Sequence, residues 1–69
     1  MEKIYLRDEF IKLGQALKKA GMVDSGVEAK EVILEGQVKV NGEVDLRRGR
    51  KVYEGDVIEF DGEQILVCR

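Results

Sequence analysis

The chain has 69 residues, which is the length of one small domain covering residues 1–69. A domain of this size buries only about 60% of its unfolded surface, so there is little room for a deep active-site cleft. No apolar run approaches the length of a membrane span and no signal-peptide pattern opens the chain, so we expect no membrane partner. The single cysteine, Cys68, cannot form an internal disulfide, which favours a reducing, cytoplasmic setting.

Charge is unevenly distributed along the chain. The net charge of −2 divides into −1 for residues 1–36, +3 for residues 37–53 and −4 for residues 54–69. Salt screens charges beyond about 8 Å, so a polyanion responds to a local patch more than to the total. The middle segment is therefore where a nucleic acid would bind.

The first predicted elements are a strand and a helix. Residues 4–6 are apolar and aromatic and suit an edge strand. Asp8 is a reasonable N-cap for a helix that Gly21 would end. The residues that recur at helical spacing and predict its buried stripe are Phe10, Leu13, Leu17 and Ala20.

A second helix is predicted from Ser25 to Gly36. Ser25 and Glu28 have the spacing of a capping box. The predicted core stripe consists of Ala29, Val32 and Ile33. Val27 and Leu34 lie near the opposite side, where they either pack on the first helix or stay exposed.

After Gly36 the apolar period changes from helical to alternating. The dipeptides Asn41-Gly42 and Asp61-Gly62 are tight-turn signals, because type I′ turns need positive φ at both central residues. The predicted strands cover residues 38–40, 43–46, 57–60 and 65–68. The expected fold class is α+β, with two helices packed on a small twisted antiparallel sheet.

The basic cluster Arg47–Lys51 is the sharpest candidate site. Arginine matches phosphate geometry, lysine adds a point charge, and Gly49 permits close approach to a backbone. The alternative is a solvated loop. The candidate RNA-binding residues are Lys12, Lys18, Lys19, Lys30, Lys39, Arg47, Arg48, Arg50 and Lys51. They would clamp phosphates of folded RNA from one convex surface, reading shape more than sequence.

Catalysis and metal binding are not indicated. The chain has no histidine, so Cys68 has no partner for nucleophilic catalysis. No P-loop or zinc spacing is present, and no cofactor is expected. Tyr5 and Tyr53 either stack on unpaired bases or cap the sheet. The acidic residues that fit outward strand and turn positions better than a metal or acid–base site are Glu54, Asp56, Glu59, Asp61 and Glu63.

The order of these features resembles the S4-type RNA-binding domain from Phe10 to Phe60. The first half of the pattern comprises Leu13, Leu17, Gly21, Ser25, Ala29 and Val32-Ile33. The second half comprises Gly36, Val38-Lys39-Val40-Asn41-Gly42 and Gly55-Asp56-Val57-Ile58. The chain departs from the family at Gly26, where arginine is common, and at residues 11–13, which lack an Arg-Leu-Asp opening.

The resemblance implies a non-catalytic protein that binds structured RNA, of the ribosomal or transfer RNA class, with the two-helix face and the adjoining basic loop. Members of the family are usually appended to larger RNA-acting proteins, and the loop Arg47–Lys51 resembles the basic loop of the short, stand-alone bacterial branch. The alternative is a protein-interaction module that docks through Val27 and Leu34 on a ribosomal or RNA-processing partner. We expect a monomer.

Overall fold

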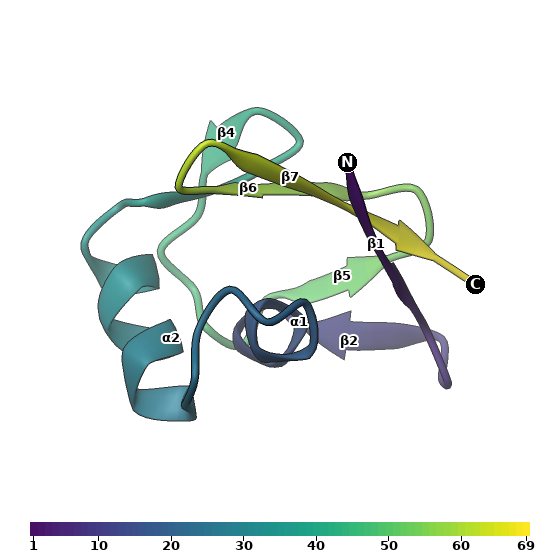
Figure 1. The fold of residues 1–69 in the computed structure, drawn as a ribbon, viewed down its shortest axis with the longest axis horizontal. Helices are drawn as coiled ribbons and strands as arrows, with labels where there is room; N and C mark the ends of the chain where they lie inside the picture. The colour runs from purple at the N-terminus through teal and green to yellow at the C-terminus, as the bar shows by residue number, and fades with distance from the viewer.

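The computed structural model describes all 69 residues as two layers (Figure 1). A five-stranded sheet in the order β1-β7-β6-β3-β4 forms one layer. Its strands are β1 (Glu2–Tyr5), β3 (Val38–Val40), β4 (Glu43–Val44), β6 (Val57–Phe60) and β7 (Glu63–Cys68). The other layer contains α1 (Leu13–Lys19), α2 (Gly26–Leu34) and a two-stranded ribbon of β2 (Phe10–Lys12) and β5 (Lys51–Tyr53). The α+β class with two helices on a sheet is confirmed.

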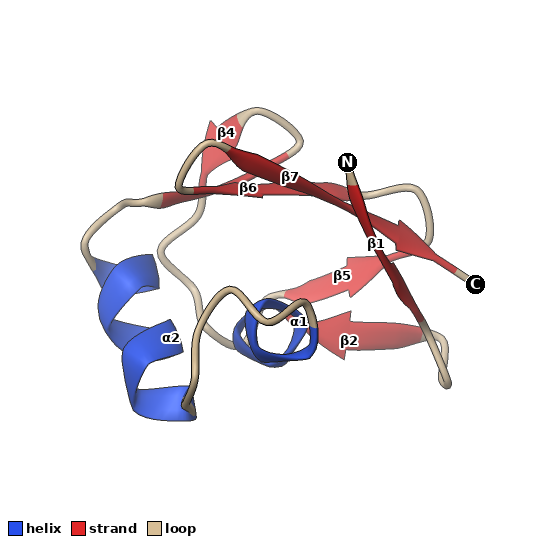
Figure 2. Cartoon of the chain, viewed as in Figure 1, coloured by secondary structure: helices blue, strands red, loops and turns tan.

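The five-stranded sheet is mixed rather than purely antiparallel. Strand β1 pairs in parallel with β7, with Ile4 opposite Val67 and Tyr5 opposite Cys68. The other three pairings in this sheet are antiparallel. The expectation of an antiparallel sheet was therefore wrong at this one edge, where the first and last strands of the chain pair (Figure 2).

Both predicted tight turns are present. Asn41 and Gly42 have φ of 53° and 86°, and Asp61 and Gly62 have φ of 53° and 77°. Positive φ at two successive residues is the signature of a type I′ turn, whose twist matches the flanking strands. These turns set the β3–β4 and β6–β7 hairpins. The return strand β4 is shorter than expected, because pairing ends at Val44.

The first helix begins later than predicted. Asp8 is not its N-cap, and Phe10–Lys12 is a strand paired with Lys51–Tyr53. The N-cap is Lys12, whose side chain makes no capping bond. Local spacing favoured a longer helix here, but pairing with a strand some forty residues away fixes these residues as extended.

The second helix begins at the predicted capping box. The Ser25 hydroxyl accepts a hydrogen bond from the Glu28 N–H at 3.1 Å. The Glu28 carboxylate accepts one from the N–H of Asp24 at 2.8 Å, one residue before the expected partner. Val27 and Leu34 are 68% and 58% exposed, so they do not pack on the first helix.

The buried side chains of the core lie between the two layers whose backbone is drawn in Figure 2. From the five-stranded sheet, the buried side chains are Ile4, Val38, Val40, Ile58, Ile65 and Val67. From the helices, the connecting loop and the ribbon, they are Leu13, Ala16, Leu17, Val23, Ala29, Ile33 and Val52. No helix is long and apolar enough to span a bilayer.

Candidate nucleic-acid interface

A groove lies where the start of α1, the start of α2 and the β4–β5 loop (residues 45–50) meet. Its volume is about 360 Å³. The residues that line this basic groove are Lys12, Gly14, Gln15, Lys18, Gly26, Ala29, Arg48 and Gly49. Three of these side chains are basic and none is acidic. The sequence led us to expect a convex surface here, but the surface is hollowed.

The β4–β5 loop is tied to the first turn of α1 by its backbone. The N–H of Leu13 donates to the carbonyl of Arg50 at 2.8 Å, and the N–H of Gly14 donates to the carbonyl of Arg48 at 3.1 Å. The first N–H groups of a helix have no partner within the helix, so these carbonyls take the place of a side-chain cap. This link holds Arg48 beside Lys12 and Lys18.

Arg48 lies across Gly14. A Cβ built on Gly14 would be 2.8 Å from the Arg48 Cγ, which is closer than van der Waals contact allows. Any larger residue would therefore push the arginine side chain away from the helix. A second glycine of the groove, Gly26, has open space around its Cβ position. A larger residue at this position would meet no neighbouring atom at its Cβ.

Asp45 organises the β4–β5 loop from inside. It is 6% exposed and forms ion pairs of 2.9 Å with both Arg47 and Arg50. Its Oδ1 also accepts the backbone N–H of Arg47 at 2.9 Å, which closes an Asx turn. Two of the predicted phosphate-binding arginines therefore already have a carboxylate partner.

These contacts change the acidity of Asp45. The pKa of Asp45 is lowered to about 2, mainly because the guanidinium of Arg47 donates hydrogen bonds to its carboxylate, while burial acts in the opposite direction. The Arg47 N–H and the Arg50 guanidinium contribute smaller parts of the same lowering. Asp45 is therefore ionised at neutral pH and neutralises part of the positive charge of the loop.

The structure brings together some of the predicted site residues. Lys12, Lys18 and Arg48 line the basic groove. Lys51 lies opposite Lys12 in the ribbon. Lys30 is exposed on α2, one helical turn after Gly26.

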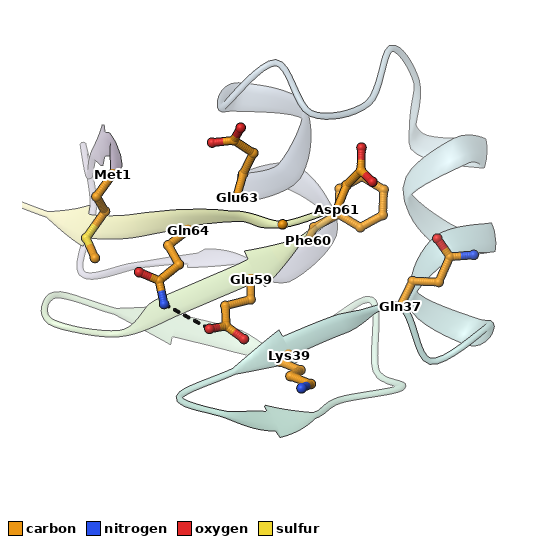
Figure 3. Close-up of a pocket in the computed structure, with 9 residues that line it drawn as sticks. Met1, Gln37, Lys39, Glu59, Phe60, Asp61, Glu63 and Gln64 are labelled. Carbon is orange, nitrogen blue, oxygen red and sulfur yellow. Dashed lines mark hydrogen bonds between the residues drawn. The ribbon is translucent and has the colours of Figure 1, made fainter.

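Other predicted residues are engaged elsewhere or lie apart. Lys19 donates from its Nζ to the carbonyl of Tyr5 at 2.8 Å. Lys39 alternates with the buried Val38 and Val40, so it points to the outer sheet face, away from the helices. Figure 3 shows Lys39 on the same side of the sheet as Glu59 and Gln64. These residues line a hollow of about 470 Å³ that Asp61 and Glu63 also border at the β6–β7 turn. The acidic C-terminal strands thus lie on the opposite side from the basic groove.

Sequence reasoning missed the roles of Gly14 and Asp45. The role of Gly14 depends on a loop more than thirty positions later, so no local signal identifies it. Asp45 did carry a signal, because an aspartate two residues before Arg47 has the spacing of an Asx turn.

Two helices on a mixed sheet, with a basic groove between the helices and a loop, define a small α+β binding domain. The chain belongs to the S4 domain family, whose model matches residues 4–68. Over 59 residues it is 51% identical to RlbA of Bacillus subtilis, which is named as a ribosome maturation protein; the match covers 86% of this chain and 83% of RlbA. Over 57 residues it is 40% identical to YbcJ of Escherichia coli, which is named as an RNA-binding protein; the match covers 83% of this chain and 81% of YbcJ.

The fold is also shared with a solved structure. The solution structure of E. coli YbcJ superimposes with a TM-score of 0.77 at 36% identity, covering 100% of this chain and 89% of YbcJ. That structure is described as revealing a motif involved in RNA binding. The fold and the motif order inferred from the residues are thus both confirmed.

Proposed function

We propose that this protein binds structured RNA, without catalysis, by holding backbone phosphates in the basic groove. The observation that carries this proposal is the composition of the groove, which has three cations and no carboxylate in a protein whose net charge is −2. Phosphate contacts supply most of the sequence-independent affinity for nucleic acids. The names of RlbA and YbcJ support the same function.

The groove favours recognition of RNA shape. Lys12, Lys18 and Arg48 converge on one hollow, and Lys51 extends the positive surface along the ribbon. The deep major groove of an RNA duplex hides its base edges from side chains, so contacts along the backbone select for shape. We infer that the ligand is a folded segment of ribosomal or transfer RNA. The name of RlbA favours ribosomal RNA.

The absence of a catalytic role is part of the proposal. It rests on a sequence with no histidine and one isolated cysteine, which lacks the usual nucleophile and base pairs. The lone Cys68 also underlies the proposed cytoplasmic setting.

A second candidate function is protein docking through α2. Val27 and Leu34 are both exposed and lie seven positions apart on the same side of this helix. Exposed apolar side chains on one helix face fit a groove on a partner protein. This candidate gives the basic groove no role.

The salt dependence of RNA binding tests the proposed function. If about four phosphates are neutralised, the logarithm of the affinity should fall with the logarithm of salt concentration at a slope near −3. The measurement is a fluorescence titration of one RNA hairpin at several salt concentrations. No binding at low salt, or a slope near zero, would contradict the proposal and leave protein docking as the better account.

A further inference from the structure

The outer face of the β2–β5 ribbon carries two aromatic rings and two lysines. Phe10 pairs with Tyr53 across the strands, and Lys12 pairs with Lys51. Residues directly opposite each other in an antiparallel pair have their side chains on the same face. The residues between them face inward, since Val52 is fully buried and Ile11 packs against the core. The four outer side chains therefore form one strip, which we call the aromatic strip.

Tyr53 is the accessible ring of this strip. The Phe10 and Tyr53 ring centroids are 5.9 Å apart, with planes inclined at 50°. The Nζ of Lys51 lies 4.8 Å from the Phe10 centroid, so Lys51 covers a face of that ring in a cation–π contact. Phe10 is half-buried, whereas Tyr53 is 43% exposed. Phe10 thus positions Lys51 and Tyr53, and Tyr53 has the free surface.

The two lysines of the strip have no anionic partner. Like charges directly opposite each other on a sheet are destabilising. Neither Lys12 nor Lys51 forms an ion pair, because the only ion pairs in the structure are those of Asp45. A phosphate close to both ammonium groups would replace repulsion with attraction. Lys12 also lines the basic groove, so the aromatic strip continues directly from it.

We propose that Tyr53 stacks on an unpaired base that adjoins the folded RNA segment, while Lys12 and Lys51 bind the phosphates next to that base. This inference rests on the proposed function and extends its ligand from a duplex to a junction between paired and unpaired RNA. Stacking on an aromatic side chain tolerates any base, because every base has a π face. A single stacked base changes affinity by about fivefold or more.

The experiment compares two RNA hairpins that have the same number of phosphates. Both carry a short single-stranded extension, which has bases in one hairpin and is abasic in the other. Wild-type protein should bind the hairpin with bases about fivefold to tenfold more tightly. Tyr53→Leu should lose this preference while binding the abasic hairpin as the wild type does, and Tyr53→Phe should retain the preference.

The outcomes separate this inference from the proposed function. Equal binding of both hairpins by the wild type would overturn the stacking role and leave groove binding intact. A preference that persists in Tyr53→Leu would also overturn it, because leucine covers the ribbon without offering a π face. Failure to bind either hairpin would overturn the proposed function itself.

Discussion

Reversing the charge of Lys18 and Arg48 together should weaken binding of a folded RNA by about a hundredfold, or about 3 kcal/mol. Both side chains line the basic groove and neither has a carboxylate partner. Each change to glutamate removes one phosphate contact and adds repulsion against the RNA backbone. Titration of the wild type and of Lys18→Glu/Arg48→Glu against one hairpin measures the loss.

A matched control for this variant is the double change Lys3→Glu/Arg69→Glu. Both residues are exposed and line no part of the groove, and the net charge changes by the same amount. This control should lose far less affinity than the groove variant, because screening limits effects beyond about 8 Å. Equal weakening by both variants would mean that only the total charge matters. Thermal unfolding of both proteins confirms that they are folded.

The structure favours this pair over a reversal of the whole arginine cluster. Arg47 and Arg50 both form ion pairs with Asp45. Glutamates at these two positions would surround a buried carboxylate with like charge and disrupt the loop. Lost RNA binding would then report lost structure. The guanidinium of Arg48 forms no ion pair within the loop. Reversing the charge of Arg48 therefore tests its contact with phosphate.

Asp45→Asn should destabilise the domain by about 2 kcal/mol at pH 7 and should also weaken RNA binding. The Asp45 carboxylate accepts four hydrogen bonds from Arg47 and Arg50. Its loss frees a loop whose carbonyls cap α1 and whose Arg48 lines the groove. Removal of a negative charge alone would strengthen RNA binding, so weaker binding identifies the ordering role. Urea unfolding and the hairpin titration measure the two effects.

The pH dependence of stability tests the same ion pairs. The pKa of Asp45 is lowered from 3.8 to about 2 in the folded chain. The stabilisation is therefore complete above about pH 4 and is lost as the pH falls through about 2. Because Arg47 is largely exposed, solvent screening keeps this contribution on the order of 1 to 2 kcal/mol. The stability gap between wild type and Asp45→Asn should close over this range; a constant gap would contradict the assignment.

The parts of the fold that follow from local chemistry were predictable. Turns at Asn41-Gly42 and Asp61-Gly62 and the cap at Ser25 each depend on a few adjacent residues. The errors concern contacts between distant residues. Phe10–Lys12 reads locally as helix but pairs with β5, and β1 pairs in parallel with the last strand. Hydrophobic periodicity is read over a short stretch of sequence, and in both cases the partner strand lies outside that stretch.

The candidate site was predictable as a set of charges but not as a surface. The basic cluster and the α1 lysines were identified from their residue types, and the fold places Lys12, Lys18 and Arg48 in one groove. The separate placement of Lys39 depends on which face of β3 it occupies, which only the complete sheet defines. The pairing of Arg47 and Arg50 with Asp45 reduces the free charge that composition suggests.

The most direct test of the central claim is the position of the RNA on the protein surface, observed in amide NMR spectra during a titration with an RNA hairpin. Glycine amides give a distinct set of signals, and Gly14, Gly26 and Gly49 all line the basic groove. These three signals should shift as RNA is added, while those of Gly42 and Gly62, in the turns of the five-stranded sheet, should stay in place. Shifts at Gly42 and Gly62 with none at the groove glycines would contradict the account.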